Sequence, residues 1–284
     1  MAALPPYTTL FERIWHYAFR VICGLILFFL IMPILVIIPL SFNAGDYFTF
    51  TKEMLALDPA GYSLQWYQDF FTNPNWQGAV RNSVNISIFS TLIATTLGTL
   101  AALGLSQAQM PAKSAIMALL LSPMIVPLII SAAGMYFFYS RVGLQGTLIG
   151  VILAHAALGT PFVVITVTAT LVGFDRSLIR AALGLGASPF TVLRRVIVPI
   201  ILPGVVSGAL FAFITSFDEV VVVLFVGSFE QRTIPWQMFS GIREHISPTI
   251  LAVATVLVGV SIVLLTVLEL LRRRSERLRG VASN

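Results

Sequence analysis

The sequence predicts an all-α integral membrane protein with six membrane-spanning helices. Hydrophobic residues make up 57% of the 284 residues, charged residues make up only 10%, and the mean hydropathy is +0.93. A soluble domain carries about 25% charged residues, so this chain has too little charge to cover a water-facing surface. Each long apolar stretch is therefore a candidate for a helix that crosses a bilayer.

Six stretches are long enough to span a membrane. A bilayer core about 30 Å thick needs roughly 20 apolar residues in a helix. The stretches are residues 21–42, 83–105, 114–138, 147–172, 198–226 and 248–271. The first is too long for a cleaved signal peptide and lacks a small-residue cleavage site, which predicts a retained helix. The expected organisation is an N-terminal segment (1–20), one membrane domain (21–271) and a basic tail (272–284).

Lys and Arg residues are distributed unequally between the two sides of the predicted bundle. Cytoplasmic ends of spans carry an excess of these residues. With both termini in the cytoplasm, only five of the 17 lie on the outer side: Lys52, Arg81, Arg141, Arg232 and Arg243. The bias predicts cytoplasmic termini, and it explains the isoelectric point of about 9.7 without nucleic acid as a partner. The arginine run at 272–274 is typical of a stop-transfer anchor.

Two connections between the predicted spans are long. The outer one, residues 43–82, has aromatic residues whose spacing suits one or two amphipathic helices at the membrane interface. These residues are Trp66, Tyr67, Phe70, Phe71 and Trp76. The inner one, residues 173–197, carries more information about function and is analysed below.

Several enzyme classes and metal sites are excluded by missing residues. The chain contains no Gly-Lys pair, so it has no phosphate-binding loop of the G-x-x-x-x-G-K-[ST] type. His16, His155 and His245 are far apart and lack metal-ligand spacing. The single cysteine, Cys23, permits neither an internal disulfide nor a cysteine metal cluster. We therefore expect no enzyme, no metal site and no cofactor in this chain.

The inner connection predicts a helix–turn–helix that projects from the membrane. Asp175 or Ser177 can cap a short helix over 178–183, and Gly184 and Gly186 permit a sharp reversal. Ser188 can cap a second helix, with a proline at its first position. This helix, residues 189–196, has an apolar face with Phe190 and ends in two arginines. It is either a docking helix for a partner or a surface helix that only connects two spans.

This loop resembles the signature of permease subunits of binding-protein-dependent ABC importers, which reads EAA, three residues, Gly, nine residues, I-x-L-P. The matching positions are Ala181, Ala182, Gly186 and Pro199, and Val196 and Val198 replace Ile and Leu. Arg180 stands where the family has Glu, which reverses a charge. Further segments resemble the spermidine/putrescine permease group, most of all its second permease. They are Asn82-Ser83, residues 158–164, residues 216–222 and residues 246–250.

The resemblance implies a type I importer fold in the bacterial inner membrane. It implies a second permease, two ATP-binding subunits and a periplasmic substrate-binding protein as partners, in addition to membrane lipid. ATP and Mg²⁺ would bind to the ATPase subunits. The residues implied in ATPase coupling are Arg180, Ala181, Ala182, Gly186, Ser188, Phe190 and Pro199.

Two acidic residues, Asp218 and Glu219, interrupt the fifth apolar stretch. A carboxylate in a bilayer costs a few kcal/mol and usually faces a bundle interior or a watery path. The pair suits a cationic amine as cargo, and Tyr136 and Tyr139 could add cation–π contacts. The alternatives are an interior salt bridge with Arg81 or Arg141, a capping role near the outer interface, and an interfacial aromatic belt.

The leading hypothesis from sequence is the permease subunit of an ATP-driven polyamine importer. Within the same class, the cargo could instead be an opine, an amino-acid derivative or an aminophosphonate. A stand-alone channel or secondary carrier is the alternative from a different class, and it would need no docking helix.

Overall fold

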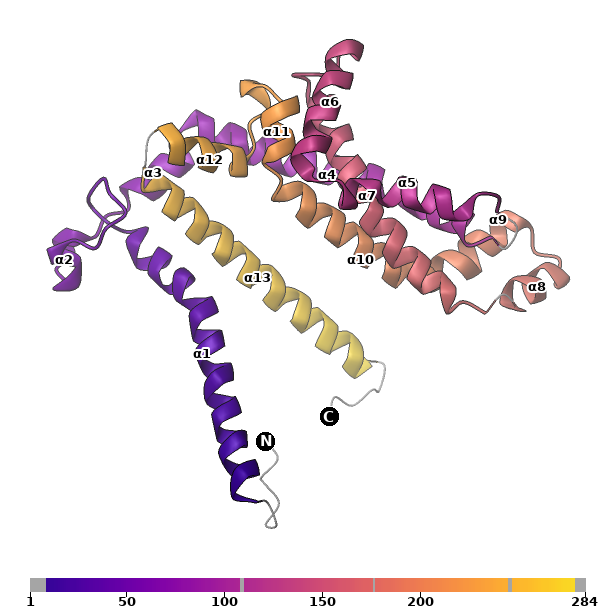
Figure 1. Ribbon diagram of the computed structural model, residues 1–284, viewed down its shortest axis with the longest axis horizontal. Helices are drawn as coiled ribbons and strands as arrows, with labels where there is room; N and C mark the ends of the chain where they lie inside the picture. The colour runs from indigo at the N-terminus through magenta and orange to yellow at the C-terminus, as the bar shows by residue number, and fades with distance from the viewer. Residues whose placement is uncertain (1–8, 108–109, 176, 245–246, 279–284) are drawn as a thin grey trace. The chain divides into compact units, whose positions relative to one another are not determined.

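The computed structural model describes residues 9–107, 110–175, 177–244 and 247–278, which form helices and their connections (Figure 1). The chain divides into two compact units. The first combines Met1–Asn73 with Glu244–Asn284, and the second is Pro74–Arg243. Residues 279–284 of the predicted basic tail, Arg176 and His245 lie outside the described residues.

The first unit contains the first and last long helices of the chain. Its helices are α1 (Leu10–Leu40), α2 (Lys52–Leu55), η1 (Pro59–Gly61), α3 (Gln65–Thr72) and α13 (Thr249–Leu278). Helix α1 begins well before residue 21 because Thr9 and Glu12 form a capping box at its N-terminus. Helix α3 carries Trp66, Tyr67, Phe70 and Phe71, and it packs against α13, where Thr249 Oγ1 donates to Asp69 Oδ2 at 2.8 Å.

The second unit is built around three long helices that lie side by side, α4 (Pro74–Leu105), α7 (Leu148–Val172) and α10 (Val198–Phe217) (Figure 1). Its other elements are α5 (Lys113–Ile125), α6 (Leu128–Val142), α8 (Ser177–Gly184), α9 (Pro189–Val192), η2 (Leu193–Ile197), α11 (Val221–Val226), η3 (Phe229–Gln231) and α12 (Ile234–Glu244). The connection at residues 173–197 and the acidic pair Asp218 and Glu219 therefore belong to one unit.

Small residues allow α4, α7 and α10 to approach closely. A Cβ added at Gly208 of α10 would meet Thr166 Oγ1 at 2.5 Å and Val163 Cα at 2.8 Å. A Cβ added at Gly98 of α4 would meet Val163 Cβ at 2.7 Å. Helices in a membrane associate through close packing rather than through a hydrophobic driving force, which favours glycine at such contacts. These glycines fix the spacing of the three-helix core.

Two predicted spans are not continuous helices. The stretch 114–138 forms α5 and α6, which are bent by 104°. The break occurs at Val126 because Pro127 lacks an N–H donor and favours extended backbone in the residue before it. The stretch 198–226 forms α10 and α11, with a break at residues 218–220. Hydropathy alone detects neither interruption, because the residues on both sides are apolar.

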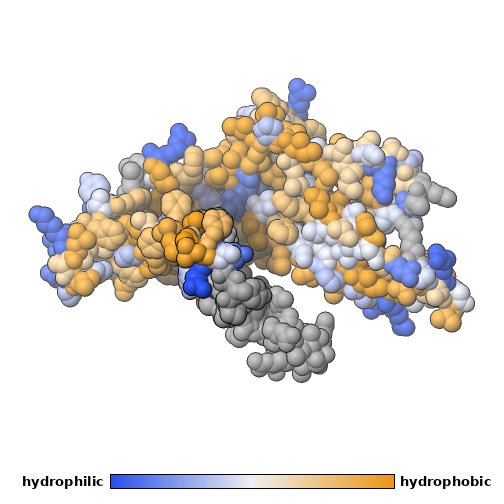
Figure 2. All heavy atoms as spheres, turned by 60° about the horizontal axis from the view of Figure 1, so that its bottom comes forward, coloured by the Kyte–Doolittle hydropathy of each residue, from blue (hydrophilic) through white to orange (hydrophobic). Residues whose placement is uncertain are grey.

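Among the described residues, four helices are long and apolar enough to cross a membrane, and the bent pair α5–α6 would make a fifth if it is one span. The four are α1, α4, α7 and the continuous helix Pro189–Phe217. In α13, the apolar part found among the described residues is Thr249–Val263. Apolar residues cover most of the surface in view in Figure 2, as expected for a chain whose surroundings include lipid. The number of six spans stays a prediction.

Candidate functional site

The helix–turn–helix predicted within residues 173–197 is present in the second unit. Asp175 Oδ1 accepts a hydrogen bond from Ser177 N at 2.8 Å, and its Oδ2 accepts one from Ser177 Oγ at 2.6 Å. These hydrogen bonds lower the pKa of the Asp175 carboxyl and support the start of α8. At α9, Ser188 Oγ accepts from Thr191 N at 3.3 Å, and Pro189 takes the first helical position.

The reversal between α8 and α9 depends on the backbone of Gly186. Its φ is +81°, in the left-handed region that side chains other than glycine rarely adopt. A Cβ at Gly186 would meet no atom within 4 Å, and the same holds for Gly184, whose φ is not positive. The requirement for glycine at 186 within this chain is therefore conformational, and space does not require it.

Most of the residues implied in coupling are exposed. Phe190 is 71% exposed and Leu185 is 90% exposed. Arg180, Ala181, Gly186, Ser188 and Pro199 are exposed as well, whereas Ala182 is half-buried. A large aromatic side chain on a short exposed helix has no packing role in its own unit. This surface is available to a partner.

The helix that carries Phe190 is continuous with α10. The α-helical turn Pro189–Val192 passes into the π-helical turn η2, which leads directly into α10, so one helix runs from Pro189 to Phe217. Pro199 lies at the second position of α10. Phe190 and the break at Asp218 thus lie at the two ends of one helix. Short π-helical segments are often found at functional sites.

Asp218 and Glu219 occupy the break between α10 and α11, and their environments differ. Asp218 is the C-cap of α10 and is exposed. Glu219 is only 8% exposed, and its Oε1 accepts a hydrogen bond from Val222 N at 3.0 Å. In the described part of the chain, neither carboxylate forms an ion pair with Arg81 or Arg141. Glu219 thus caps α11, and Asp218 is the carboxylate that a cargo could reach.

The two tyrosines are differently placed on α6. Tyr139 is 8% exposed and belongs to an apolar cluster with Val222, Val223 and Val226 of α11. Tyr136 is half-buried and lies edge-on to Phe137, with ring centroids 5.5 Å apart. Tyr139 therefore holds α6 against the helix that Glu219 caps. The contact of either tyrosine with cargo stays a prediction.

A buried polar cluster joins the three core helices close to this break, and sequence reasoning gave it no role. Ser216 Oγ of α10 lies 2.9 Å from His155 Nδ1 of α7 and accepts a hydrogen bond from Ser90 Oγ of α4 at 2.8 Å. All three side chains are at most 4% exposed. The signal in the sequence was a few serines and one histidine within three apolar stretches, which does not show that they meet.

The imidazole of His155 is only partly satisfied. Its Nδ1 has Ser216 as a partner, whereas Nε2 is buried and has no hydrogen-bond partner in the described residues. Leaving a buried polar atom unpaired costs about 1–3 kcal/mol. The cluster therefore links α4, α7 and α10, and one ring nitrogen of His155 stays without a partner among the described residues.

Residues 16–279 match the family described as binding-protein-dependent transport system inner membrane component. The chain belongs to this family. The permease is 33% identical over 247 residues to the spermidine/putrescine transport system permease protein PotC of Haemophilus influenzae, covering 87% of this chain and 93% of the relative. It is 31% identical to PotC of Escherichia coli, covering 86% and 90%. It is 28% identical to the E. coli putrescine transport system permease protein PotI, covering 81% and 82%.

Solved structures share the fold of the permease. A bacterial ABC transporter involved in the import of the acidic polysaccharide alginate has a chain with a TM-score of 0.70 and 16% identity, covering 93% of this chain and 99% of its own. The MetNI methionine ABC transporter gives a TM-score of 0.52 at 21% identity, covering 72% and 95%. These similarities establish the type I ABC permease fold and leave the cargo open.

Proposed function

We propose that this permease subunit moves polyamines, such as spermidine or putrescine, from a periplasmic binding protein to the cytoplasm. The similarity to PotC over 93% of that protein's length carries the proposal. Family membership argues against a stand-alone channel or secondary carrier. The proposed assembly contains a second permease and two ATPase subunits that bind ATP and Mg²⁺. Both termini lie in the cytoplasm, in agreement with the Lys and Arg bias.

The cargo assignment is supported by the charge at the break in the fifth span. Asp218 is exposed and forms no ion pair in the described part of the chain, so it can attract an amine without first losing a partner. The fold does not decide the charge of the cargo, since the transporter of similar fold named above is involved in importing an acidic polysaccharide. Opines, amino-acid derivatives and aminophosphonates are the alternative cargoes.

The cargo is tested by uptake into proteoliposomes that contain the complete transporter and its binding protein. We expect ATP-dependent uptake of labelled spermidine or putrescine, and an excess of an unlabelled amino-acid derivative or aminophosphonate should not compete. Uptake of only one of those competitors would assign the permease to a different cargo within the same class.

Coupling to the ATPase is proposed to pass through Phe190 and the helix that carries it. Phe190→Ala should lower substrate-stimulated ATP hydrolysis by about tenfold or more, because a buried aromatic anchor contributes about 2 kcal/mol or more to an interface. Its thermal stability should stay unchanged, because Phe190 is 71% exposed in the isolated chain. Phe137→Ala is the matched control, since Phe137 is 67% exposed on α6. Full ATPase stimulation in Phe190→Ala would contradict the proposed contact.

Substitutions at Gly186 and Gly184 test whether the turn between α8 and α9 needs glycine for its own folding or for binding the ATPase. Gly186→Ala must adopt a positive φ, whereas Gly184→Ala need not. In the isolated permease, Gly186→Ala should cost only about 1–2 kcal/mol of local strain. We therefore expect normal yield for both variants, and a loss of co-purified ATPase for Gly186→Ala alone. Equal co-purification would show that the turn needs no glycine for assembly.

Arg180 is proposed to contact an acidic group on the ATPase, because it reverses the sign of the usual Glu. It is exposed, and its charge contributes to the lowered pKa of Asp175. Arg180→Ala should reduce transport slightly, and Arg180→Glu should reduce it further by placing a carboxylate opposite the acidic partner. The measurement is the uptake of labelled polyamine by both variants. Equal uptake by Arg180→Ala and Arg180→Glu would contradict an acidic partner for Arg180.

A further inference from the structure

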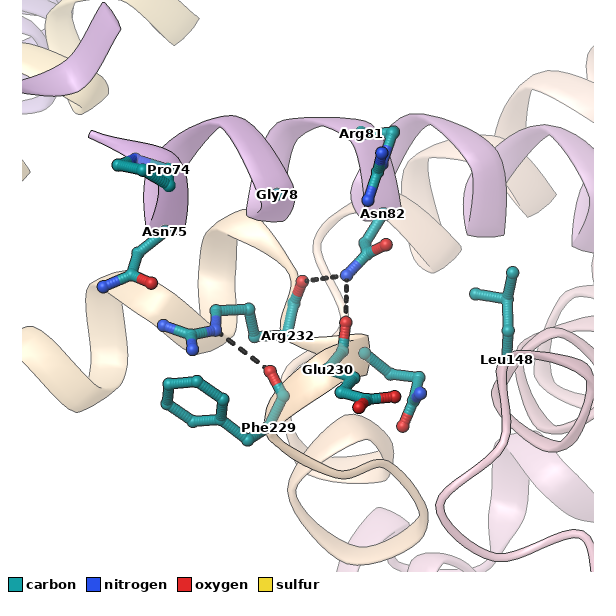
Figure 3. Close-up of a pocket in the computed structure, with 10 residues that line it drawn as sticks. Pro74, Asn75, Gly78, Arg81, Asn82, Leu148, Phe229, Glu230 and Arg232 are labelled. Carbon is teal, nitrogen blue, oxygen red and sulfur yellow. Dashed lines mark hydrogen bonds between the residues drawn. The ribbon is translucent and has the colours of Figure 1, made fainter. Parts of the chain in front are cut away.

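The second unit contains a polar pocket whose lining residues belong neither to the segment 173–197 nor to the break at residues 218–220. It has a volume of about 450 Å³ and lies between the first turns of α4 and the loop around η3 (Figure 3). Its lining includes Asn75, Gly78, Arg81, Asn82, Glu230 and Arg232. Arg81 and Arg232 are two of the five basic residues that the charge bias places on the outer side of the membrane.

The pocket is held in shape by hydrogen bonds between segments about 150 residues apart. Asn82 Nδ2 donates to the carbonyl oxygens of Glu230 at 2.7 Å and Arg232 at 3.0 Å. Ile234 N donates to Ser83 Oγ at 2.8 Å. These bonds fix the loop against α4, as the dashed lines from Asn82 in Figure 3 show. The cavity therefore exists before any ligand arrives.

Arg232 is a buried cation without a counter-ion in the described part of the chain. Only 6% of the residue is exposed, and its guanidinium carbon lies 3.2 Å from the Phe229 ring centroid. Its Nε donates to the Phe229 carbonyl at 3.0 Å, and its Nη1 donates to Gln237 Oε1 at 3.1 Å. Both acceptors are neutral. Burial lowers the pKa of Arg232, as expected where the charge is incompletely compensated.

The other charges of the pocket add to this positive field. Arg81 is exposed on α4 and lines the same cavity, where Glu230 is the only acidic residue among its lining residues. The first turn of α4 contains no acidic residue, so its N-terminal partial positive charge is not neutralised there. Guanidinium groups form strong, charge-assisted hydrogen bonds with carboxylates. The pocket is thus suited to one anionic group.

We propose that this pocket receives an acidic side chain of the substrate-binding protein when that protein docks. The inference rests on the proposed function, because it needs the outward orientation and the binding protein. The family is binding-protein-dependent, so a protein partner must approach this permease from the side where its cargo arrives. An arginine that is already buried and ordered loses little conformational entropy on binding. It would serve as a preformed anchor at the contact.

The test measures the affinity of the purified binding protein for the complete transporter in nanodiscs, at low and at moderate salt. Arg81→Gln removes a charge, and Arg141→Gln is its control on α6, outside the pocket. Gly78→Trp fills the pocket, because a Cβ at Gly78 meets no atom within 4 Å, whereas Gly78→Ala leaves most of the space open. None of these changes removes a hydrogen bond that holds the loop.

Arg81→Gln should weaken binding about fivefold at low salt and flatten its salt dependence, as expected for an exposed charge. Gly78→Trp should weaken binding more than tenfold, with Gly78→Ala close to wild type. Wild-type affinity for the binding protein in both Arg81→Gln and Gly78→Trp would overturn the inference. A loss of affinity that occurs only in nanodiscs with anionic lipid would also overturn it, because it would assign the pocket to a lipid headgroup. If the wild-type transporter binds no substrate-binding protein, the proposed function fails and this occupant fails with it.

Discussion

Gly208→Val should lower both the yield of the folded permease and its thermal unfolding temperature. The added Cβ would approach Val163 Cα to 2.8 Å and Thr166 Oγ1 to 2.5 Å, so α10 would have to move away from α7. Overpacking of a close-packed interior costs about 1–3 kcal/mol, and contact with backbone atoms places this change at the upper end. The measurement is the yield of monodisperse protein in detergent together with its thermal unfolding temperature.

Gly104→Val supplies the control for this experiment. Gly104 also lies in a core helix, α4, but a Cβ there would meet no atom within 4 Å. The same chemical change should leave yield and unfolding temperature close to wild type. If Gly208→Val unfolds at the wild-type temperature, the close approach of α7 and α10 is not needed for stability.

Asp218→Asn should lower uptake of a labelled polyamine about tenfold or more, because hydrogen bonds to charged groups are worth about 1.5–3 kcal/mol. Asp218 is exposed at the break between α10 and α11, so removing its charge should not alter the thermal stability of the complex. Uptake and unfolding temperature are measured on the same preparations. Full uptake by Asp218→Asn would contradict a role of this carboxylate in attracting cargo.

Glu219 provides the contrast, because its carboxylate is buried and caps α11. Glu219→Gln keeps an oxygen that can accept from Val222 N, so both stability and uptake should stay near wild type. Glu219→Leu removes the acceptor and should destabilise the complex by about 1–3 kcal/mol. A strong loss of uptake in Glu219→Gln with normal stability would assign the cargo contact to Glu219 instead of Asp218.

The buried cluster of Ser90, His155 and Ser216 shows why a sequence reveals only part of a membrane protein's polar interior. Each residue is a polar side chain within a long apolar stretch, and it lowers the mean hydropathy of that stretch only slightly. The hydrogen bonds join residues 61 and 126 positions apart in the chain. Their meeting depends on the rotation of three helices about their axes, which the close packing at Gly98 and Gly208 determines.

The acidic pair illustrates the same limit at shorter range. The sequence placed Asp218 and Glu219 inside one continuous span, where one could line a path while the other pairs with an arginine or a backbone group, and it did not decide which residue does which. The structure ends α10 at Phe217 and starts α11 at Val221, so that one carboxylate is exposed and the other accepts a backbone hydrogen bond. The interruption leaves the first backbone N–H groups of α11 without helical partners, and Glu219 accepts a hydrogen bond from one of them.

The sequence by itself determined the membrane class, the position of most long helices, and the helix–turn–helix at residues 173–197 with its caps at Asp175 and Ser188. These features depend on local hydropathy and on hydrogen bonds between residues at most three positions apart. The tertiary structure alone decided the meeting of Ser90, His155 and Ser216 between three helices, and the pocket that joins Asn82 to the loop at Arg232. These features depend on contacts between distant segments, whose energies no local pattern of residues records.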